Sequence, residues 1–427
     1  MCWLVRLVRS LKKLVYDTIE RLQLKNVIIV GRVSGEQKAA LLSRCKGLVP
    51  YTLHLLARGG RRCKLLFNTN SYIKQMANNI FFERYTNIRD IKKQWLQLDK
   101  VADSINDEYI KYTYYQTYEW NEFLYDHLTK GLSGLTTTMC YDLVTVSGKP
   151  FGIIPLTVTR LSKKARIPSC RVAGVLNMVC PYVEDFGEDI VSAVADHIKR
   201  TYKGMKLSLA DVPCCSPFAK VMSMVCDNVQ ERTSYHVPLS LFASHDEYVS
   251  SLPKNIYKNI RKAYNHLKTD GKSMQLRVFG RHNMPSEGYM RSLWMLYLRR
   301  KMAWRNRKIN VVESLKIEIK SMFETYSGCA GASLRLLDAA ELYVLEIDGT
   351  PAAFMIVYRH HNRLLMPKLA IDTTFSRYSP GILLILEASK MWIDEGIADF
   401  DMCRGDERYK KEMGGINEPL CRIDKRL

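Results

Sequence analysis

The segment Arg377-Tyr378-Ser379-Pro380-Gly381-Ile382 has the residue types of a phosphate-binding turn. A tight loop directly before an apolar helix leaves backbone N–H groups unpaired, and it places them at the positive end of the helix dipole. Pro380 removes one donor from that set, because proline has no N–H group. The same Ser-Pro-Gly run also starts ordinary helices. The segment therefore predicts either an anion site or a plain helix start.

Carboxylates on or beside the neighbouring predicted strands could take a proton from an attacking group. They are Glu346, Asp372, Asp401 and Glu407. We prefer Asp401 and Asp372, because both are expected near the separating ends of the strands that flank the turn at Arg377. Either aspartate could equally serve as a structural hydrogen-bond acceptor.

The sequence lacks the patterns of several common sites. It has no Cys-x-x-Cys or His-Glu-x-x-His pattern, so we expect no metal site. A Gly-x-Ser-x-Gly elbow and a Gly-x-x-x-x-Gly-Lys-Ser/Thr loop are also missing, which argues against the corresponding hydrolases and nucleotide triphosphatases. The 12 cysteines are scattered without framework spacing, so disulfides are not expected. His360 and His361 are interpreted as exposed residues of a hairpin tip.

Positive charge is concentrated in two segments. The whole chain has 64 Lys and Arg against 43 Asp and Glu, a formal net charge of +21. Residues 1–110 contain 20 Lys and Arg against 9 Asp and Glu, and residues 251–310 contain 15 against 2. The remainder is close to neutral or slightly acidic. Local excesses of this kind indicate contact with anionic partners such as phosphates or a membrane surface.

Residues 1–24 predict an amphipathic helix, since apolar residues recur every three or four positions with Arg6, Arg9, Lys12 and Lys13 between them. Such a helix can dock on a core or rest on an anionic membrane surface. The same charges interrupt any apolar core of signal-peptide length, and no later stretch reaches about 18 to 20 uncharged apolar residues. We therefore expect a cytoplasmic protein, with peripheral contact to the inner face of the membrane as an option.

The elements that must position these residues fall into two consecutive units. With 427 residues, 47% of them hydrophobic, the chain is long enough for two or three domains with buried cores. In the first unit, periodicity predicts helices at 95–110, 114–127 and 190–202, a hairpin at 139–161, and strands at 206–212 and 235–239. In the second unit it predicts helices at 254–268, 286–300, 312–325, 380–395 and 406–413, and strands at 274–279, 342–347, 350–358, 363–371 and 397–403.

The order strand, hairpin, strand, helix, strand, helix in the second unit resembles that of a GNAT acyltransferase. Three stretches carry the likeness, at 348–353, 376–384 and 399–410. They resemble the GNAT branch named for the CelD-like acetyltransferases of cellulose biosynthesis. The stretches 116–120 and 255–267 are similar to that branch as well. The likeness covers about residues 87–415.

This resemblance implies the fold class and the order of domains. The fold class is α/β, with an α+β mixed sheet, in tandem GNAT-like units preceded by a basic helical N-terminal region. Residues 1–86 would be that region, whose role is unknown. Residues 87–240 would form the first unit on the acceptor side, and residues 241–427 the second unit with the acyl-coenzyme A site.

The resemblance also implies a co-substrate and its binding residues. That co-substrate would be acetyl-coenzyme A or another acyl-coenzyme A, without a metal. Its pyrophosphate would lie at Arg377, Tyr378, Ser379, Gly381 and Ile382. Familiar GNAT enzymes have Arg/Gln-x-x-Gly-x-Gly/Ala at this place, whereas this chain has a single glycine.

Tyr409 resembles the tyrosine of the Tyr-x-Lys segment that protonates the leaving thiolate in many GNAT enzymes, although a packing role is an equal alternative. Asp401 or Asp372 would then deprotonate the attacking amine, which must be neutral to react. The acceptor implied by the resemblance is a small-molecule or glycan amine, such as an amino sugar of a surface polysaccharide.

Two other functions stay open. Fem aminoacyltransferases also have tandem GNAT-like units but use aminoacyl-tRNA, and the basic segment 251–310 would then bind its phosphate backbone. We favour acyl-coenzyme A, because that segment has no RNA-reading motif and coenzyme A is itself polyanionic. Nucleic acid is otherwise not expected as a partner. The other function is a non-catalytic module that recruits an anionic polymer or a membrane, which the single-glycine loop supports.

Overall fold

The computed structural model describes residues 80–104, 112–130, 132–168, 177–182, 187–226, 229–304 and 311–427. All of these belong to one compact unit, residues 70–427. The helix predicted for residues 1–24 lies outside the described residues. Among the helices that are described, none is both long enough and apolar enough to cross a membrane.

The first of two mixed sheets has the strand order β1-β2-β3-β4-β5-β14-β6. Its strands are β1 (Ile80–Tyr85), β2 (Thr137–Val146), β3 (Lys149–Thr159), β4 (Lys164–Arg166), β5 (Lys206–Pro213), β6 (Val229–Arg232) and β14 (Leu420–Arg426). Successive side chains of a strand point to opposite faces, so β2 and β3 contribute to two cores. One core contains α5 (Glu188–Thr201) and α6 (Pro217–Val225), and the other contains α3 (Lys92–Ser104) and α4 (Tyr118–Thr129).

The second sheet has the strand order β13-β7-β12-β11-β10-β9-β8. Its strands are β7 (Ser234–Val237), β8 (Met274–Phe279), β9 (Ala340–Ile347), β10 (Thr350–His360), β11 (Arg363–Ile371), β12 (Asp399–Arg404) and β13 (Ile416–Asn417). Its helices are α7 (His245–Ser251), α8 (Lys254–Thr269), α9 (Glu287–Trp304), α10 (Val311–Tyr326), α11 (Cys329–Leu336), α12 (Pro380–Asp394) and α13 (Arg408–Glu412).

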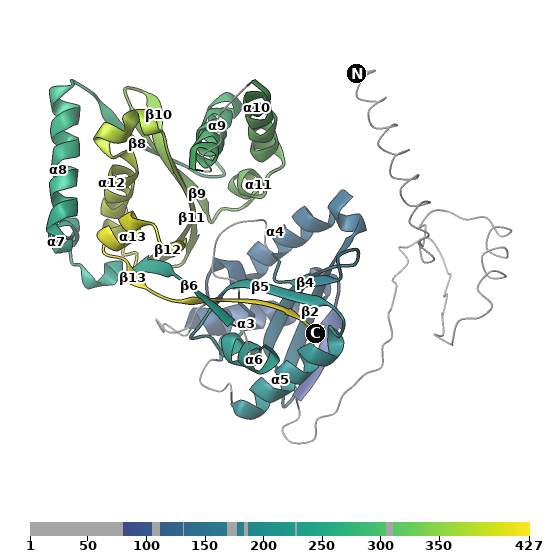
Figure 1. Cartoon of the computed structure of the whole chain (residues 1–427). Coiled ribbons are helices and arrows are strands. Elements are labelled where there is room, and N and C mark those ends of the chain that lie inside the picture. The colour runs from purple at the N-terminus through teal and green to yellow at the C-terminus, as the bar shows by residue number, and fades with distance from the viewer. Residues whose placement is uncertain are drawn as a thin grey trace, which may run out of the picture. The chain divides into compact units, whose positions relative to one another are not determined.

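Helices cover both faces of the second sheet. On β9, Tyr343 and Leu345 pack with α8 and α12, whereas Leu342 and Val344 pack with α9 and α11. Figure 1 shows α8 and α12 on one side of this sheet and α9, α10 and α11 on the other. Both faces are therefore buried, and the β9 and β10 strands are nearly continuous runs of apolar residues.

Two tight turns set the register of the hairpins. Asp348 and Gly349 join β9 to β10 with φ angles of 50° and 71°. Ser147 and Gly148 join β2 to β3 with φ angles of 50° and 78°. Positive φ at both central residues is the type I′ geometry that matches the twist of the strands. The hairpins predicted at 139–161 and 342–358 are confirmed.

The strand predicted at 235–239 exists as β7 but lies in the other sheet. We expected it to close the first unit, and that expectation was wrong. It pairs with β12 through Val237 and Phe400, and with β13 through His236 and Ile416. Conversely, the C-terminal strand β14 pairs with β5 and β6 of the first sheet, as the yellow strand in Figure 1 shows. The second sheet thus lies in sequence between strands of the first.

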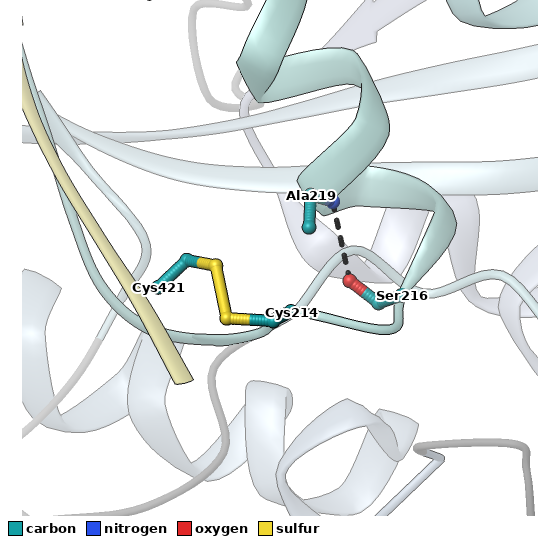
Figure 2. Close-up of a disulfide and its surroundings, with 4 residues drawn as sticks. All are labelled: Cys214, Ser216, Ala219 and Cys421. Atoms are coloured by element: carbon teal, nitrogen blue, oxygen red, sulfur yellow. Dashed lines mark hydrogen bonds between the residues drawn. A yellow bond between two sulfur atoms is a disulfide. The ribbon is translucent and has the colours of Figure 1, made fainter. Parts of the chain in front are cut away.

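The expectation that the chain has no disulfide is also contradicted. Cys214, directly after β5, is bonded to Cys421 of β14 across 207 positions of sequence (Figure 2). The spacing gave no signal, because the antiparallel pairing of β5 with β14 brings these cysteines together. In Figure 2 the neighbouring Ser216 begins α6, and its hydroxyl accepts a hydrogen bond from the Ala219 N–H group at 3.2 Å.

Candidate active site

The strands β11 and β12 pair for only a short distance and then separate. Their parallel pairing joins Arg363 to Asp399, Leu364 to Phe400 and Leu365 to Asp401. Beyond that level, β11 continues for six residues alongside β10, and the described residues give no further pair with β12. Backbone groups on the facing edges are thereby released from the sheet and can contact a bound molecule.

An irregularity in β11 lies at the point of separation. Tyr358 of β10 pairs with Leu365, and Ile356 pairs with Lys368, so two residues of β11 stand opposite the single residue Val357. A bulge of this kind redirects the backbone groups and side chains around it. The backbone N–H of Met366, one of the two bulged residues, faces the thiol of Cys403 on β12.

The turn after β11 holds the residues predicted to bind the pyrophosphate. Arg377 is exposed and its Nε lies 3.1 Å from Asp270 Oδ2 at the end of α8. The Tyr378 hydroxyl donates a hydrogen bond to Asp270 at 2.8 Å, and this hydrogen bond raises the pKa of Tyr378. The turn is therefore tied to α8, the basic helix.

Ser379 and Gly381 shape the start of α12. Ser379 has a left-handed backbone, with φ of 47°, and its carbonyl accepts from the N–H groups of Ile382 and Leu383 at 3.0 and 3.2 Å. These two donors are already used within the helix. A Cβ atom on Gly381 would lie 2.9 Å from Ile371 Cγ2, so only glycine fits here without displacement. Arg377 and the Gly381 backbone are consequently the groups of this turn best placed to contact a phosphate.

The structure does not bring Asp401 and Asp372 together. Asp401 lies level with Leu365, where the strands separate, whereas Asp372 is seven residues further along β11, roughly 20 Å at about 3.3 Å per residue. Asp401 is buried and accepts a hydrogen bond from the Cys403 N–H group at 2.6 Å. Asp372 accepts from the Thr374 N–H and hydroxyl groups at 2.9 and 2.8 Å. Both carboxylates support local backbone structure, and only Asp401 is at the strand opening.

Tyr409 lies on α13, immediately after β12, and is half-buried. Burial, the largest cause, raises the pKa of its hydroxyl well above the usual value, so the group keeps its proton. Arg300 of α9 lies within electrostatic range of Tyr409 and Glu407, and burial lowers the pKa of Arg300. The Tyr409 hydroxyl therefore carries a proton that it can donate, and its raised pKa makes it a weaker acid than an exposed tyrosine.

Arg300 and Lys410 are neighbours of this site that the sequence did not identify. Lys410 is 2% exposed, and its Nζ donates to the carbonyl oxygens of Cys403 and Arg404 at 2.9 Å each. It also pairs with Glu407 at 3.0 Å. Lys410 thereby fixes α13, and with it Tyr409, against the end of β12. Its place in the Tyr-x-Lys segment was the available signal, whereas Arg300 lies 109 positions from Tyr409 in the printed sequence.

An aromatic contact joins the first unit to the sheet of the candidate site. Tyr114 stacks on Tyr358 of β10 with ring centroids 5.7 Å apart, and Trp120 meets Tyr358 edge-on at 5.1 Å. Burial, followed by the charges of Cys403, Tyr358 and Asp401, raises the pKa of the Tyr115 hydroxyl well above its usual value. The stretch 116–120, singled out in the sequence, lies beside this contact.

A group of metal-ligand types lies at the opposite end of β10. Within the described part of the chain, ligand atoms of Asp103, His360 and His361 lie within 4.8 Å of one another. His361 Nε2 is 2.7 Å from Asp103 Oδ1. Burial lowers the pKa of His360 to about 4, so its ring is neutral. The hydrogen bond with Asp103 accounts for His361, and the absence of a metal from the reaction stays a prediction.

Comparison with known families finds a similarity for part of the second unit. Residues 254–411 match the family model described as an acetyltransferase (GNAT) domain. This part of the chain is similar to GNAT acetyltransferase domains. The match contains the opening between β11 and β12, the turn at Arg377 and Tyr409, so the site described above lies within the matched stretch. The described fold has two mixed sheets with helices, as the predicted α/β class requires.

Solved structures are similar over most of the chain at low sequence identity. A tandem GNAT protein from the clavulanic acid biosynthesis pathway is 12% identical, with a TM-score of 0.46, covering 81% of this chain and 98% of that one. FemX is 10% identical, with a TM-score of 0.46, covering 79% and 96%. The C-terminal domain of a lysylphosphatidylglycerol synthetase from Agrobacterium fabrum is 11% identical, with a TM-score of 0.41, covering 79% and 92%. No curated protein matches the sequence.

Proposed function

We propose that this protein is an acyl-coenzyme A-dependent N-acyltransferase that transfers an acyl group, acetyl in the simplest case, to an amine. The observation that carries the proposal is the opening between β11 and β12, which lies inside the matched stretch and is flanked by a bulge, a helix start and Tyr409. A thioester placed in this opening would meet the backbone of β11 on one side and a protonated hydroxyl on the other.

In this proposal the amine attacks the thioester carbonyl directly. The C–N bond forms, the C–S bond breaks, and the sulfur leaves as a thiolate. A backbone N–H group of β11 beyond the bulge would stabilise the charge on the carbonyl oxygen, as an oxyanion-hole donor does. Within the bulge, Pro367 has no N–H group and the Met366 N–H faces the Cys403 thiol. Tyr409 would give its proton to the thiolate and recover one from solvent. The amine nitrogen would lose its extra proton to a general base.

Asp401 is the base we propose among the two aspartates selected from the sequence. It lies where the strands separate, whereas Asp372 lies at the far end of β11. Asp372 is then assigned to capping the turn that carries Arg377, because it accepts the Thr374 N–H group. Arg377, Tyr378, Ser379, Gly381 and Ile382 would hold the pyrophosphate side of the coenzyme.

In the division of the chain that we propose, residues 87–240 form the first unit, and this unit would shape the acceptor side. The acceptor we propose is an amino sugar of a surface polysaccharide, which the resemblance to the CelD-like acetyltransferases suggests. The location we propose is cytoplasmic, with residues 1–86 available for contact with an anionic membrane surface.

Calorimetric titration with acetyl-coenzyme A tests the proposal directly. The full chain should bind acetyl-coenzyme A, and Arg377→Ala should weaken binding by about 10-fold or more, since a guanidinium–phosphate contact is a charge-assisted hydrogen bond. Arg408→Ala, which removes an exposed arginine paired only within its own helix, should bind like the unaltered protein. Equal affinities of the unaltered protein and Arg377→Ala would refute the cofactor site, and no binding to either would refute the function.

The solvent face of α8 supports a second candidate. Its exposed residues include Lys254, Lys258, Arg261, Lys262 and Lys268, and the helix contains no acidic residue. Such a face suits the phosphate backbone of an aminoacyl-tRNA donor, whose binding weakens steeply with salt. A gel shift with tRNA at about 50 and 200 mM salt separates the two donors. A salt-sensitive shift would favour the aminoacyl-tRNA donor, and no shift at low salt would exclude it.

A further inference from the structure

Lys368 lies three residues after Leu365, where β11 and β12 separate, and against the face covered by α9. Its Nζ is 4.6 Å from the ring centroid of Trp294 and 4.7 Å from that of Tyr297. Contacts of this kind hold the ammonium over aromatic faces by cation–π attraction. Together Lys368, Trp294 and Tyr297 are called the Lys368 cluster below.

The ammonium of Lys368 has no counter-ion of its own. Within the described residues it forms neither an ion pair nor a hydrogen bond with a carboxylate. Burial lowers the pKa of Lys368, and Glu324 of α10 opposes this only from a distance. A buried cation is stabilised most by a bound anion, because the anion supplies both charge and acceptor atoms.

Trp294 supplies a second, independent sign of a ligand. The residue is 1% exposed, and its indole Nε1 has no hydrogen-bond partner among the described residues. Indole and ammonium groups can only donate hydrogen bonds. Arg291, one turn earlier on α9, also has a buried Nε without a partner. A ligand at these groups must therefore bring acceptor atoms.

The Lys368 cluster is connected to the reaction centre by α9 itself. Trp294 and Arg300 lie six residues apart on this helix, roughly 9 Å along its axis at about 1.5 Å per residue. Arg300 lies within electrostatic range of Tyr409. One small molecule could thus place a charged group at Lys368 and its reacting nitrogen at the strand opening.

We infer that Lys368, Trp294 and Tyr297 bind an anionic group, a carboxylate or a phosphate, that the amine acceptor carries. The inference rests on the proposed function, because it assigns the acceptor of that reaction to the class of anionic amines. Lys368 is in this view a specificity-determining residue: it orients the acceptor and takes no part in proton transfer.

The test compares three amines by calorimetry with the full chain, without acetyl-coenzyme A. Glucosamine is neutral apart from its amine, muramic acid adds a carboxylate, and glucosamine 6-phosphate adds a phosphate. We expect one of the two anionic amines to bind at least about 10-fold more tightly than glucosamine, which is the strength of one charge-assisted hydrogen bond. Comparing the two anionic amines distinguishes a carboxylate from a phosphate ligand.

Variants then assign that preference to the cluster. Lys368→Met should remove it while keeping the length of the side chain. Trp294→Phe, which keeps a ring and removes the N–H group, should reduce it about fivefold. Lys390→Met, at an exposed position of α12, is the control and should retain it. An unchanged preference in Lys368→Met, or glucosamine binding as tightly as both anionic amines, would overturn the inference.

A parallel measurement keeps the inference separate from the proposed function. Acetyl-coenzyme A binding and thiol release are measured on the same proteins. If Lys368→Met loses the preference for the anionic amine and still binds acetyl-coenzyme A, both hypotheses are supported. If anion binding depends on Lys368 but no variant binds acetyl-coenzyme A, the Lys368 site stands and the acyltransferase proposal fails.

Discussion

Gly381 stands where β11 leaves no space for a side chain. Its missing Cβ would lie 2.9 Å from Ile371 Cγ2, and Ile371 cannot move that atom without moving its own backbone or rotamer. Gly381→Ala should therefore shift the start of α12 and weaken acetyl-coenzyme A binding by about 10-fold, a change of about 1.4 kcal/mol. Calorimetric titration measures it.

Gly288 provides the matched control for this substitution. It lies near the start of α9, and nothing is within 4 Å of a Cβ built on it. Gly288→Ala should leave acetyl-coenzyme A binding unchanged and stabilise the helix by up to about 1 kcal/mol. If both alanine variants bind alike, the close approach of α12 to β11 has no role in binding.

Tyr409 should affect turnover and not binding. Because the pKa of its hydroxyl lies above the ordinary value of about 10, the proton is present throughout the neutral range and up to about pH 10. Tyr409→Phe should lower kcat by about 100-fold, within the usual contribution of a general acid, and leave the KM for acetyl-coenzyme A unchanged. Thiol release from acetyl-coenzyme A in the presence of an amine measures both constants.

The exposed Tyr257 of α8 is the control for that variant. Tyr257→Phe should behave like the unaltered protein. A Tyr409→Phe protein with full kcat would assign Tyr409 to packing, the alternative that its contact with the core of α8 and α12 also permits.

At the scale of elements, a buried charge network joins β1, β2 and α5, and we expect it to contribute strongly to the stability of the first sheet. Asp142 of β2 is fully buried, and its two oxygens meet Arg84 Nε and Nη2 at 2.6 and 2.8 Å. His197 Nε2 at 3.1 Å and the Tyr202 hydroxyl at 2.9 Å complete its partners. Burial alone would raise the pKa of Asp142, but Arg84 and His197 lower it overall.

That direction fixes the pH dependence of stability. A carboxyl whose pKa is lower in the folded than in the unfolded chain stabilises the fold above the unfolded value of about 3.9, and this contribution is lost as pH falls below it. Asp142→Asn should cost about 3 kcal/mol at pH 7, since it leaves Arg84 without its partner while Arg84 still reaches water. The cost should shrink steadily below about pH 4, because the unfolded chain of the unaltered protein then takes up a proton at Asp142 before the folded chain does.

Urea denaturation at pH 7 and at pH 3 to 4 measures this difference. Asp126→Asn is the control, because Asp126 pairs with Arg89 on the surface and such pairs contribute about 0 to 1 kcal/mol. A difference between Asp142→Asn and the unaltered protein that stays constant with pH would show that packing, and not charge, holds the network.

The elements that sequence periodicity predicted were those with strong local patterns. In α8 the buried residues Ile256, Ile260, Ala263 and Leu267 recur at helical spacing, and the structure has the helix at Lys254–Thr269 against a prediction of 254–268. The strands β8 and β11 were predicted with their observed bounds. The short helices α6 and α11 were missed, because each has fewer than ten residues and few periods to detect.

The candidate site was predictable only where its residues follow one another in the chain. The turn at Arg377 and the helix of Tyr409 could be located from local sequence. Arg300 and Lys368 could not, because α9 and β11 come together through the sheet and no sequence spacing encodes that contact. We expected Asp401 and Asp372 to lie together because both are at strand ends. The sequence does not show where β11 and β12 stop pairing, and that point separates the two aspartates.

At the scale of the whole described fold, contacts across the two sheets converge near the site. Arg404, at the end of β12, donates to both oxygens of Asp211 on β5 at 3.0 and 2.9 Å. Arg232 of β6 lies 3.6 Å from the same carboxylate. The strand that carries Asp401 and Cys403 is thereby held by the first sheet. The first unit consequently supports the geometry of the opening as well as any acceptor surface.

The disulfide between Cys214 and Cys421 joins the C-terminal strand β14 to the end of β5 within the first sheet. The closed loop contains residues 254–411, the stretch that is similar to acetyltransferase domains, so the bond restricts the unfolded chain over 207 positions. Closing so long a loop is worth several kcal/mol in the chain-entropy model, and about 2 to 4 kcal/mol is typical in practice. Cys214→Ser should lower the free energy of unfolding by that amount, measured by urea denaturation without reductant.

Cys215, the adjacent exposed cysteine, gives the control. Cys215→Ser should unfold like the unaltered protein. When the unaltered protein is denatured without reductant and alkylated, Cys214 and Cys421 should stay unmodified. Hydrogen exchange should rise in β14, β5 and β6 of Cys214→Ser but not in β11, because β14 pairs only in the first sheet. Full alkylation of both cysteines would show that they are reduced, the state expected in the cytoplasm, where disulfides rarely persist. Protection of both would instead argue for an oxidising compartment and against the cytoplasmic location proposed above.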